Sequence, residues 1–254
     1  MLAIFKREFL SYFRNPVGYI AIALFSFLSG YIFINRFASG DVNISLEIAS
    51  LRLFFVIIVP IITMGLLAED RKRGTEILYY TTPIDLFSVV AGKFLAALLL
   101  YAIMFVNVFI HMIVTKMCGG VIGVGAWGSV VVFFFLAALF ISIGIFASAI
   151  TDSQIISAIT SFIILLVVQL LSTIGKLFGD AVAAFLSILG VNSESANSIG
   201  DAINNGINWL DPFAKTGNFR YGIFSVAPLL FCISFTVIFL FLSFRILEKK
   251  RWAQ

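Results

Sequence analysis

The sequence predicts an all-α, polytopic membrane protein with six transmembrane helices and both termini in the cytoplasm. Hydrophobic residues make up 61% of the 254 positions, and charged residues make up only 12%. A soluble domain carries roughly 25% charged residues because it must wet its surface, so this deficit excludes an ordinary soluble protein. Six apolar segments are long enough, or nearly long enough, to cross a hydrocarbon core of about 30 Å. They are residues 17–35, 53–68, 94–115, 127–150, 155–174 and 224–244.

Residues 1–16 predict a separate amphipathic helix that lies on the inner membrane surface. Four apolar residues recur at helical spacing, and they are Leu2, Phe5, Phe9 and Phe13. The basic residues lie off this stripe, and Asn15 with Pro16 closes the segment. An ordinary basic flank that only sets topology is the alternative. A cleaved signal peptide is disfavoured because no small-residue cleavage site follows.

The distribution of basic residues predicts the orientation of the six spans, because cytoplasmic segments retain Lys and Arg. With the amino terminus inside, the cytoplasmic segments hold 11 of the 17 basic residues. These segments are 1–16, 69–93, 151–154 and 245–254. The remaining residues, 17–254, then form a single six-span transmembrane domain. The second span is short and contains Pro60, so we expect it to begin earlier, within residues 48–52.

The loop at 69–93 is longer than a topological turn requires. It opens with five consecutive charged residues, Glu69 to Arg73, which must lie in water because burying five charges mid-membrane would cost on the order of 12–17 kcal/mol. Gly74 offers a break, residues 75–82 predict two helical turns that end at Pro83, and Asp85 is placed to cap a second short helix. A short structured helix with apolar and charged residues indicates a docking element for another protein. A stop signal for membrane insertion is the alternative.

Three stretches of the chain resemble one family. The run "PIITMGLLAEDRKRGTEILYYTTPI", residues 60–84, is similar to the signature of type-2 ATP-binding-cassette (ABC) exporter permeases. The opening "FKREFLSYFRNP" resembles the interfacial helix of that family, and "LDPFAKTGNFRYGIF" resembles the segment before its last span. Within the family the chain is most similar to permeases associated with gliding motility, and next to those of nitrous-oxide-reductase maturation. Tyr79 and Tyr80 replace the paired aliphatic residues more usual there.

The resemblance implies a function for the charged loop. In such permeases the helix between spans two and three is a coupling helix that binds a separate ATPase subunit. Carried over onto this chain, the partner-coupling residues are Glu69, Asp70, Arg71, Arg73, Gly74, Thr75 and Glu76. The implied partners are ABC ATPase subunits, which would bind ATP and Mg²⁺, and a second permease half that is identical or homologous, including one with an extracellular domain. The implied setting is the inner membrane of a bacterium, with membrane lipid and without nucleic acid.

The chain itself has no motif for ATP hydrolysis, so we expect no enzyme, no catalytic residues and no cofactor within it. Its Gly-Lys pairs, at Lys93 and Lys176, lack the Ser or Thr that ends a phosphate-binding loop. No metal site is expected, because one His and two distant Cys cannot assemble one. His111 shares a helical face with Asn107, where hydrogen bonding between helices is commoner than a ligand role. Small residues at four-residue spacing, such as Gly144 and Ser148, favour close helix packing.

The segment 175–223 predicts either re-entrant helices at the outer leaflet or a flexible outer loop. The resemblance and the aromatic residues from Trp209 to Tyr221 favour the re-entrant alternative. Three functions are consistent with the sequence: an ATP-driven export permease, a structural membrane anchor of a motility or secretion complex, and an ATP-independent channel or scramblase. The charged loop disfavours the third, whereas nothing in the sequence separates the first two.

Overall fold

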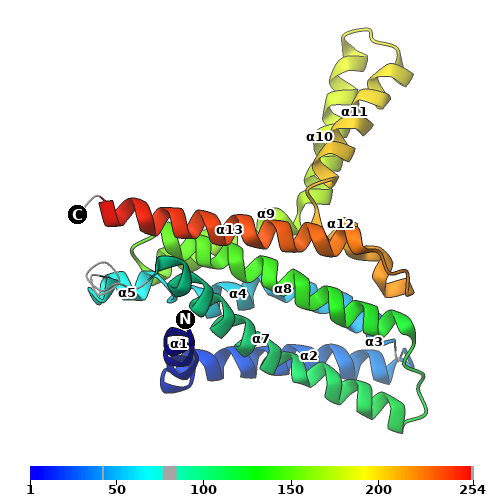
Figure 1. Cartoon of the computed structure of the whole chain (residues 1–254). Helices are drawn as coiled ribbons and strands as arrows, with labels where there is room; N and C mark the ends of the chain where they lie inside the picture. Colours follow the sequence, from blue (N-terminus) through cyan, green and yellow to red (C-terminus); the bar gives the residue numbers. More distant parts are fainter. Residues whose placement is uncertain (42, 77–84, 253–254) are drawn as a thin grey trace. The chain divides into compact units, whose positions relative to one another are not determined.

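The computed structural model describes residues 1–41, 43–76 and 85–252, and within these ranges it is helical without strands (Figure 1). The chain divides into two compact units, Met1–Leu165 with Phe219–Gln254, and Leu166–Asn218. Six helical stretches in the described ranges are long and apolar enough to cross a membrane. They are Pro16–Ala38, Ile44–Lys72, Leu86–Met117, Val124–Ile150, Leu171–Ile188 and Val226–Trp252. The predicted all-α, six-span class is confirmed, and the orientation of the termini stays a prediction.

The amphipathic helix at the amino terminus is present as α1 (Leu2–Arg14). Asn15 is extended and ends it, and Pro16 begins α2 (Pro16–Ala38) at the first helical position, where a missing N–H costs no hydrogen bond. The predicted aromatic stripe forms, since the rings of Phe5, Phe9 and Phe13 follow one another with centroids 6.1 and 5.2 Å apart. Figure 1 draws α1 nearly end-on, so it runs across the direction of the long helices. Its place on a membrane surface stays a prediction.

The second span is assembled from four helical pieces, α3 (Ile44–Leu51), the 3-10 turn η1 (Arg52–Phe54), α4 (Phe55–Thr63) and α5 (Ala68–Lys72). It begins earlier than expected, because Asn43 caps α3 by accepting a hydrogen bond from the Ser45 amide (3.0 Å). Pro60 lies inside α4. Much of the outer segment expected to precede residue 53 is therefore helix and part of the span.

Helices α7 (Leu86–Met117), α8 (Val124–Ile150) and α13 (Val226–Trp252) also belong to the first unit. Helix α8 packs against α3, α4, α7 and α13, and the core between these helices is rich in aromatic rings. Phe55 lies at its centre, 4.6 Å from the ring of Phe133, 5.0 Å from Phe140 and 5.9 Å from Tyr101. This packing holds the second, third and fourth spans together.

The fifth apolar segment differs from the expected span at 155–174. Helix α9 (Gln154–Gln169) has only 16 residues, Leu170 interrupts it, and α10 (Leu171–Ile188) follows. Within the second unit α10 and α11 (Ser193–Asn208) lie side by side, because Gly179 and Gly200 allow close backbone approach: a Cβ at Gly179 would lie 2.6 Å from the Gly200 carbonyl oxygen. The segment 175–223 is thus largely helical. Its placement in a membrane stays a prediction.

The second unit ends in a short helix, α12 (Pro212–Thr216), that a buried aspartate connects to α10. Asp211 caps α12 by accepting a hydrogen bond from the amide of Phe213 (2.7 Å), and the hydroxyl of Ser172 donates to its other oxygen. The residues that follow, Gly217–Tyr221, form the 3-10 turn η2.

Candidate functional site

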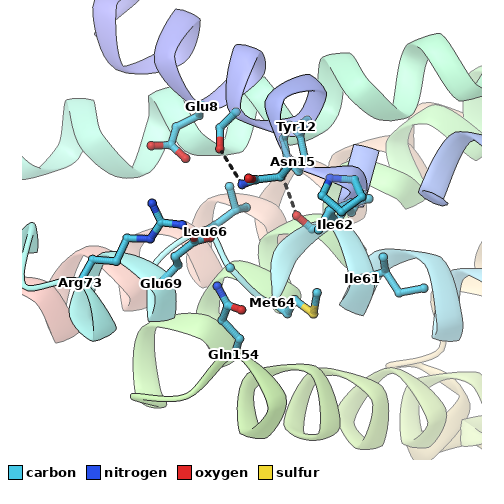
Figure 2. Close-up of a pocket in the computed structure, with 14 residues that line it drawn as sticks. Glu8, Tyr12, Asn15, Ile61, Ile62, Met64, Leu66, Glu69, Arg73 and Gln154 are labelled. Carbon is cyan, nitrogen blue, oxygen red and sulfur yellow. Dashed lines mark hydrogen bonds and ion pairs between the residues drawn. The ribbon is translucent and has the colours of Figure 1, made fainter. Parts of the chain in front are cut away.

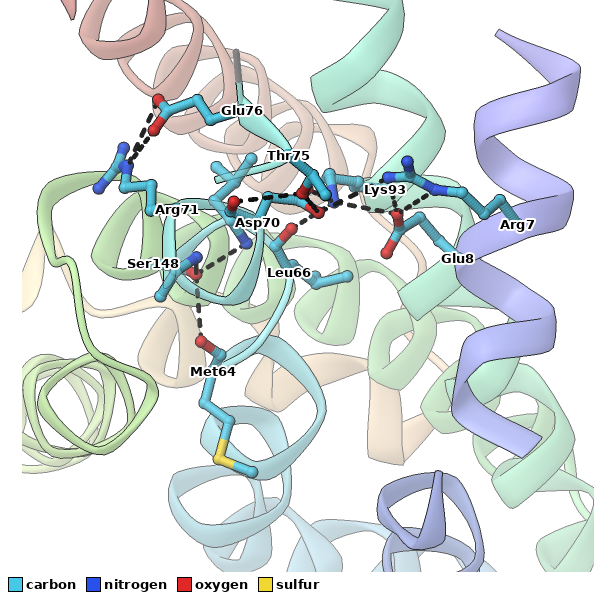
Figure 3. Close-up of polar contacts among 12 residues, drawn as sticks. Arg7, Glu8, Met64, Leu66, Asp70, Arg71, Thr75, Glu76, Lys93 and Ser148 are labelled. Atoms are coloured by element: carbon cyan, nitrogen blue, oxygen red, sulfur yellow. Dashed lines mark hydrogen bonds and ion pairs between the residues drawn. The ribbon is translucent and has the colours of Figure 1, made fainter. Parts of the chain in front are cut away.

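The predicted coupling residues begin at a break in the second span, which a serine from α8 stabilises. Between α4 and α5 the backbone leaves the helical hydrogen-bond pattern. Ser148 replaces part of it: its hydroxyl accepts from the amides of Leu67 and Ala68 (3.0 Å each) and donates to the carbonyl of Met64 (3.3 Å), as Figure 3 shows. One turn earlier, Gly144 lets α8 approach Thr63 closely. The short helix α5 is therefore fixed on α8.

A buried lysine lies beneath α5. Lys93, in the second turn of α7, is 1% exposed, and its Nζ lies 2.6 Å from Oδ2 of Asp70 and 3.1 Å from Oε1 of Glu8. Nζ also donates to the carbonyl of Leu66 (Figure 3). Arg7 of α1 lies 2.5 Å from Glu8 and 3.8 Å from Asp70. We call Glu8, Asp70 and Lys93 the ionic joint, because it connects α1, α5 and α7.

Arg71 makes the second set of contacts, on the other side of α5. Its guanidinium lies 3.3 Å from Oε2 of Glu76 and 3.2 Å from Oδ1 of Asp152, and it donates to the carbonyls of Ala149 and Thr151, the latter at 2.7 Å. A cation is favourable at a helix carboxyl terminus, where carbonyls are left without helical partners. Arg71 thereby connects the charged loop to the end of α8.

Asp152 extends these contacts to the last helix, because Lys250 of α13 lies 3.2 Å from it. The hydrogen bond from Lys250 and the charges of Lys250 and Arg71 hold the pKa of Asp152 below its ordinary value. This carboxylate therefore remains ionised and joins α13 to the same set of contacts.

A polar cavity of about 220 Å³ lies between α1 and the break in the second span (Figure 2). Glu69 and Arg73 form an ion pair at its edge, and Gly65 lines it beside Gln154. Tyr12 lines it from α1, and burial together with the charge of Glu8 raises its pKa, so the hydroxyl stays protonated. That hydroxyl donates to the carbonyl of Ile62 (2.6 Å), which the broken helix leaves without its usual amide partner.

The seven predicted coupling residues lie together, but most of them contact their own chain. Asp70, Arg71, Thr75 and Glu76 are engaged internally, since Thr75 donates to Asp70 (3.0 Å) and Arg71 pairs with Glu76. Arg73 is largely exposed and paired with Glu69, and Gly74 is exposed with φ at +69°. That φ favours glycine because it carries no Cβ. Whether these residues contact a partner stays a prediction.

The expected loop at 69–93 is helical at both of its ends. Residues Ala68–Lys72 form α5, and α7 already begins at Leu86, so the connecting segment is 73–85. Asp85 is a cap as expected, accepting from the Phe87 amide (3.1 Å), but it caps the long third span and not a separate short helix. The predicted helix at 75–82 falls mainly on 77–84, outside the described residues.

Sequence reasoning missed the roles of four residues that complete the site, and they are Glu8, Lys93, Ser148 and Asp152. Spacing indicated only close helix packing at Ser148, and the expected spans placed Lys93 in the loop at 69–93, although it lies inside α7. Glu8 and Asp152 carried no signal, because their role depends on contacts between distant parts of the chain. Among the described residues, no group of three or more His, Cys, Asp or Glu could hold a metal ion.

These features define a multi-pass helical membrane protein with a structured polar site at one end of its second and third spans. Residues 29–252 match the sequence model of the ABC-2 family transporter proteins, which covers most of the chain. The chain belongs to this family. The expected type-2 ABC permease class is confirmed, and membership implies an ABC ATPase partner in general. No match was found among curated proteins.

Proposed function

We propose that this chain is the permease subunit of an ABC transporter and that it couples ATP hydrolysis in a separate subunit to movement of its membrane spans. Family membership and six candidate spans support the class of protein. The ionic joint supports the coupling role. Lys93 is fully buried yet bonded to Asp70 at the base of the charged loop and to Glu8 of α1. A displacement of the loop would therefore move α1 and α7 together.

The ion pairs of the joint favour a concerted movement of α5 and α7, because separating paired buried charges costs free energy. A buried charge is costly unless it is paired, and removing one partner of a buried pair typically costs about 3–5 kcal/mol. Separating Asp70 from Lys93 would leave the buried ammonium with Glu8 and the Leu66 carbonyl alone, which favours movement of the two residues together. On the other side of α5, Arg71 connects the charged loop to α8, because it donates to carbonyls at the end of that helix. A partner that pushes on residues 73–85 acts on three spans at once.

The proposal assigns the chemistry to a partner. ATP and Mg²⁺ belong to the ATPase subunits, and this chain is not an enzyme. Lys93, from the first Gly-Lys pair, pairs with Glu8 and Asp70 and donates a hydrogen bond to the Leu66 carbonyl. A second permease half, identical or homologous, completes the transporter in a bacterial inner membrane. The resemblance to gliding-motility permeases supports export, or ATP-driven change in a membrane complex, linked to motility.

The test is co-purification of the tagged chain in mild detergent, followed by measurement of ATP hydrolysis. We expect an ABC ATPase to co-purify with the wild type and to be lost on deletion of residues 74–82. Lys93→Met should retain the ATPase but lose its stimulation by the permease, because the joint no longer connects α5 to α7. Lys116→Met, at the other end of the same helix, is the matched control and should behave as wild type.

Two results would contradict the proposal. If no ATPase co-purifies with the wild type, the chain acts without one. If the deletion retains the ATPase at wild-type amounts and with wild-type stimulation, residues 74–82 are not the coupling element.

A further inference from the structure

A second polar contact lies at the opposite end of α7 from the ionic joint. Nδ1 of His111 lies 2.6 Å from Oε1 of Glu47 in α3, and the Glu47 residue is 1% exposed. The two atoms share one hydrogen bond, in which Nδ1 is the donor when Glu47 is ionised. The ring of Phe33 in α2 stacks on the imidazole, with centroids 4.3 Å apart and planes 10° apart, which fixes the ring in this orientation.

Among the described residues, the Glu47 side chain is hydrogen-bonded to His111. Its other oxygen, Oε2, is buried and has no hydrogen-bond partner among the described residues. A half-satisfied carboxylate inside a helical bundle is unfavourable for stability, and a buried ionisable residue in a membrane protein indicates a functional role. The expected hydrogen bond from His111 to another helix is thus confirmed. Its partner, Glu47, lies before the expected start of the second span.

The two contacts join the same pair of spans. Lys93 and His111 are 18 residues apart on α7, about 27 Å along a helix and close to the thickness of a hydrocarbon core. Their partners, Asp70 and Glu47, lie at the two ends of the helical stretch Ile44–Lys72. The second and third spans are therefore bonded to each other at both ends, by Asp70–Lys93 and by Glu47–His111.

We propose that Glu47 and His111 form a clamp that fixes the far ends of the second and third spans to each other, so that the two spans move as one rigid unit. The ionic joint fixes one end of the two spans and the rings of Phe55 and Tyr101 pack near their middle, so the clamp supplies the polar contact at the end away from the loop. With the clamp closed, displacement at residues 73–85 reaches the opposite end of both spans. Glu47 and His111 are positioning residues, and their link to ATP-driven movement rests on the proposed function.

The rigidity is measured first, without any partner. Spin labels at Leu53→Cys in η1, six residues after Glu47, and at Met117→Cys at the end of α7, both exposed, report the distance between the two spans on the side of the clamp when Cys118 and Cys232 are replaced by Ser. We expect a narrow distance distribution in the parent protein and a broad one after His111→Ala. Asn107→Ala is the matched control, because Asn107 bonds to Ser26 of α2 (2.8 Å) and not to the second span. Equal widths in all three proteins would overturn the clamp.

The consequence for coupling is measured in the complex. We expect Glu47→Ala and His111→Ala to co-purify with the ATPase at wild-type levels and to lose its stimulation by about fivefold or more, the lower range of allosteric coupling. A short bifunctional thiol reagent across Glu47→Cys and His111→Cys should restore stimulation, which a merely destabilised protein would not show. Retained stimulation in both Ala variants, or no rescue by the cross-link, would overturn the clamp. Absence of the ATPase from the wild type would instead overturn the proposed function, while the label distances still decide the clamp.

Discussion

Asp152 shows how single residues contribute to the site. It lies in the turn after α8, and its side chain is 79% exposed, yet it contacts both Arg71 and Lys250. These partners lower its pKa, so its stabilising contribution is fully present above the ordinary carboxyl pKa and is lost as the pH falls through the lowered value. At an exposed position that contribution is at most about 1 kcal/mol.

This predicts a pH-dependent difference between Asp152→Asn and the wild type. The variant should melt slightly below the wild type at pH 7, and the gap should narrow as the pH falls through the lowered pKa of Asp152. Thermal unfolding in detergent over a series of pH values from 7 into the acid range measures this. A gap that does not narrow as the pH falls would show that the ion pairs of Asp152 do not stabilise the fold.

At the scale of helices, the close approach of α4 and α8 determines where α5 begins. A Cβ at Gly144 would lie 2.2 Å from Oγ1 of Thr63 and 2.8 Å from its Cβ, so no larger residue fits without separating the helices. One turn further along α8, Ser148 supplies the hydrogen bonds of the break. Separation of the two helices would therefore disturb both the packing and the base of the charged loop.

Gly144→Ala is expected to destabilise the protein by about 1–3 kcal/mol, the usual cost of overpacking. Gly30→Ala in α2 is the matched control, because nothing lies within 4 Å of an added Cβ there and alanine favours a helix by roughly 0.5–1 kcal/mol. Thermal unfolding in detergent should show a lower midpoint for the first and an equal or higher one for the second. Equal midpoints for the two variants would contradict the close contact.

At the scale of the whole molecule, the orientation of the spans determines whether the charged loop meets a cytoplasmic partner. Loop residues near Lys72 and the turn near Cys118 lie at opposite ends of α7 and its neighbours. The distribution of basic residues predicts that the first is cytoplasmic and the second external. The native Cys118 is exposed and Cys232 is buried, which makes the chain suitable for labelling.

We therefore expect a membrane-impermeant maleimide to label Cys118 in intact cells. In a Cys118→Ser background, Lys72→Cys should react only after the membrane is permeabilised. Labelling with the opposite pattern would place the charged loop outside and would exclude an intracellular ATPase as its partner. Mass determination of the labelled protein is the measurement.

Hydropathy and charge alone determined the all-α class, the number of candidate spans, the amphipathic first helix and the position of the charged segment at the end of the second span. These follow from composition and spacing along the chain, because transfer to lipid and helix periodicity act locally. The resemblance added the family. Close packing at Gly144 and Ser148 was also expected from spacing. The same spacing pairs Ser26 with Gly30, yet a Cβ added at Gly30 would have nothing within 4 Å.

Only the tertiary structure decided which charges face one another. It showed that Asp70 and Arg71 are engaged inside the chain, that Lys93 is fully buried between Glu8 and Asp70, and that Glu47 belongs to the second span and bonds to His111. It also showed that the fifth apolar segment is interrupted at Leu170. The physical reason is that an ion pair between helices depends on the rotation and register of each helix about its neighbour, and packing sets these over the whole bundle.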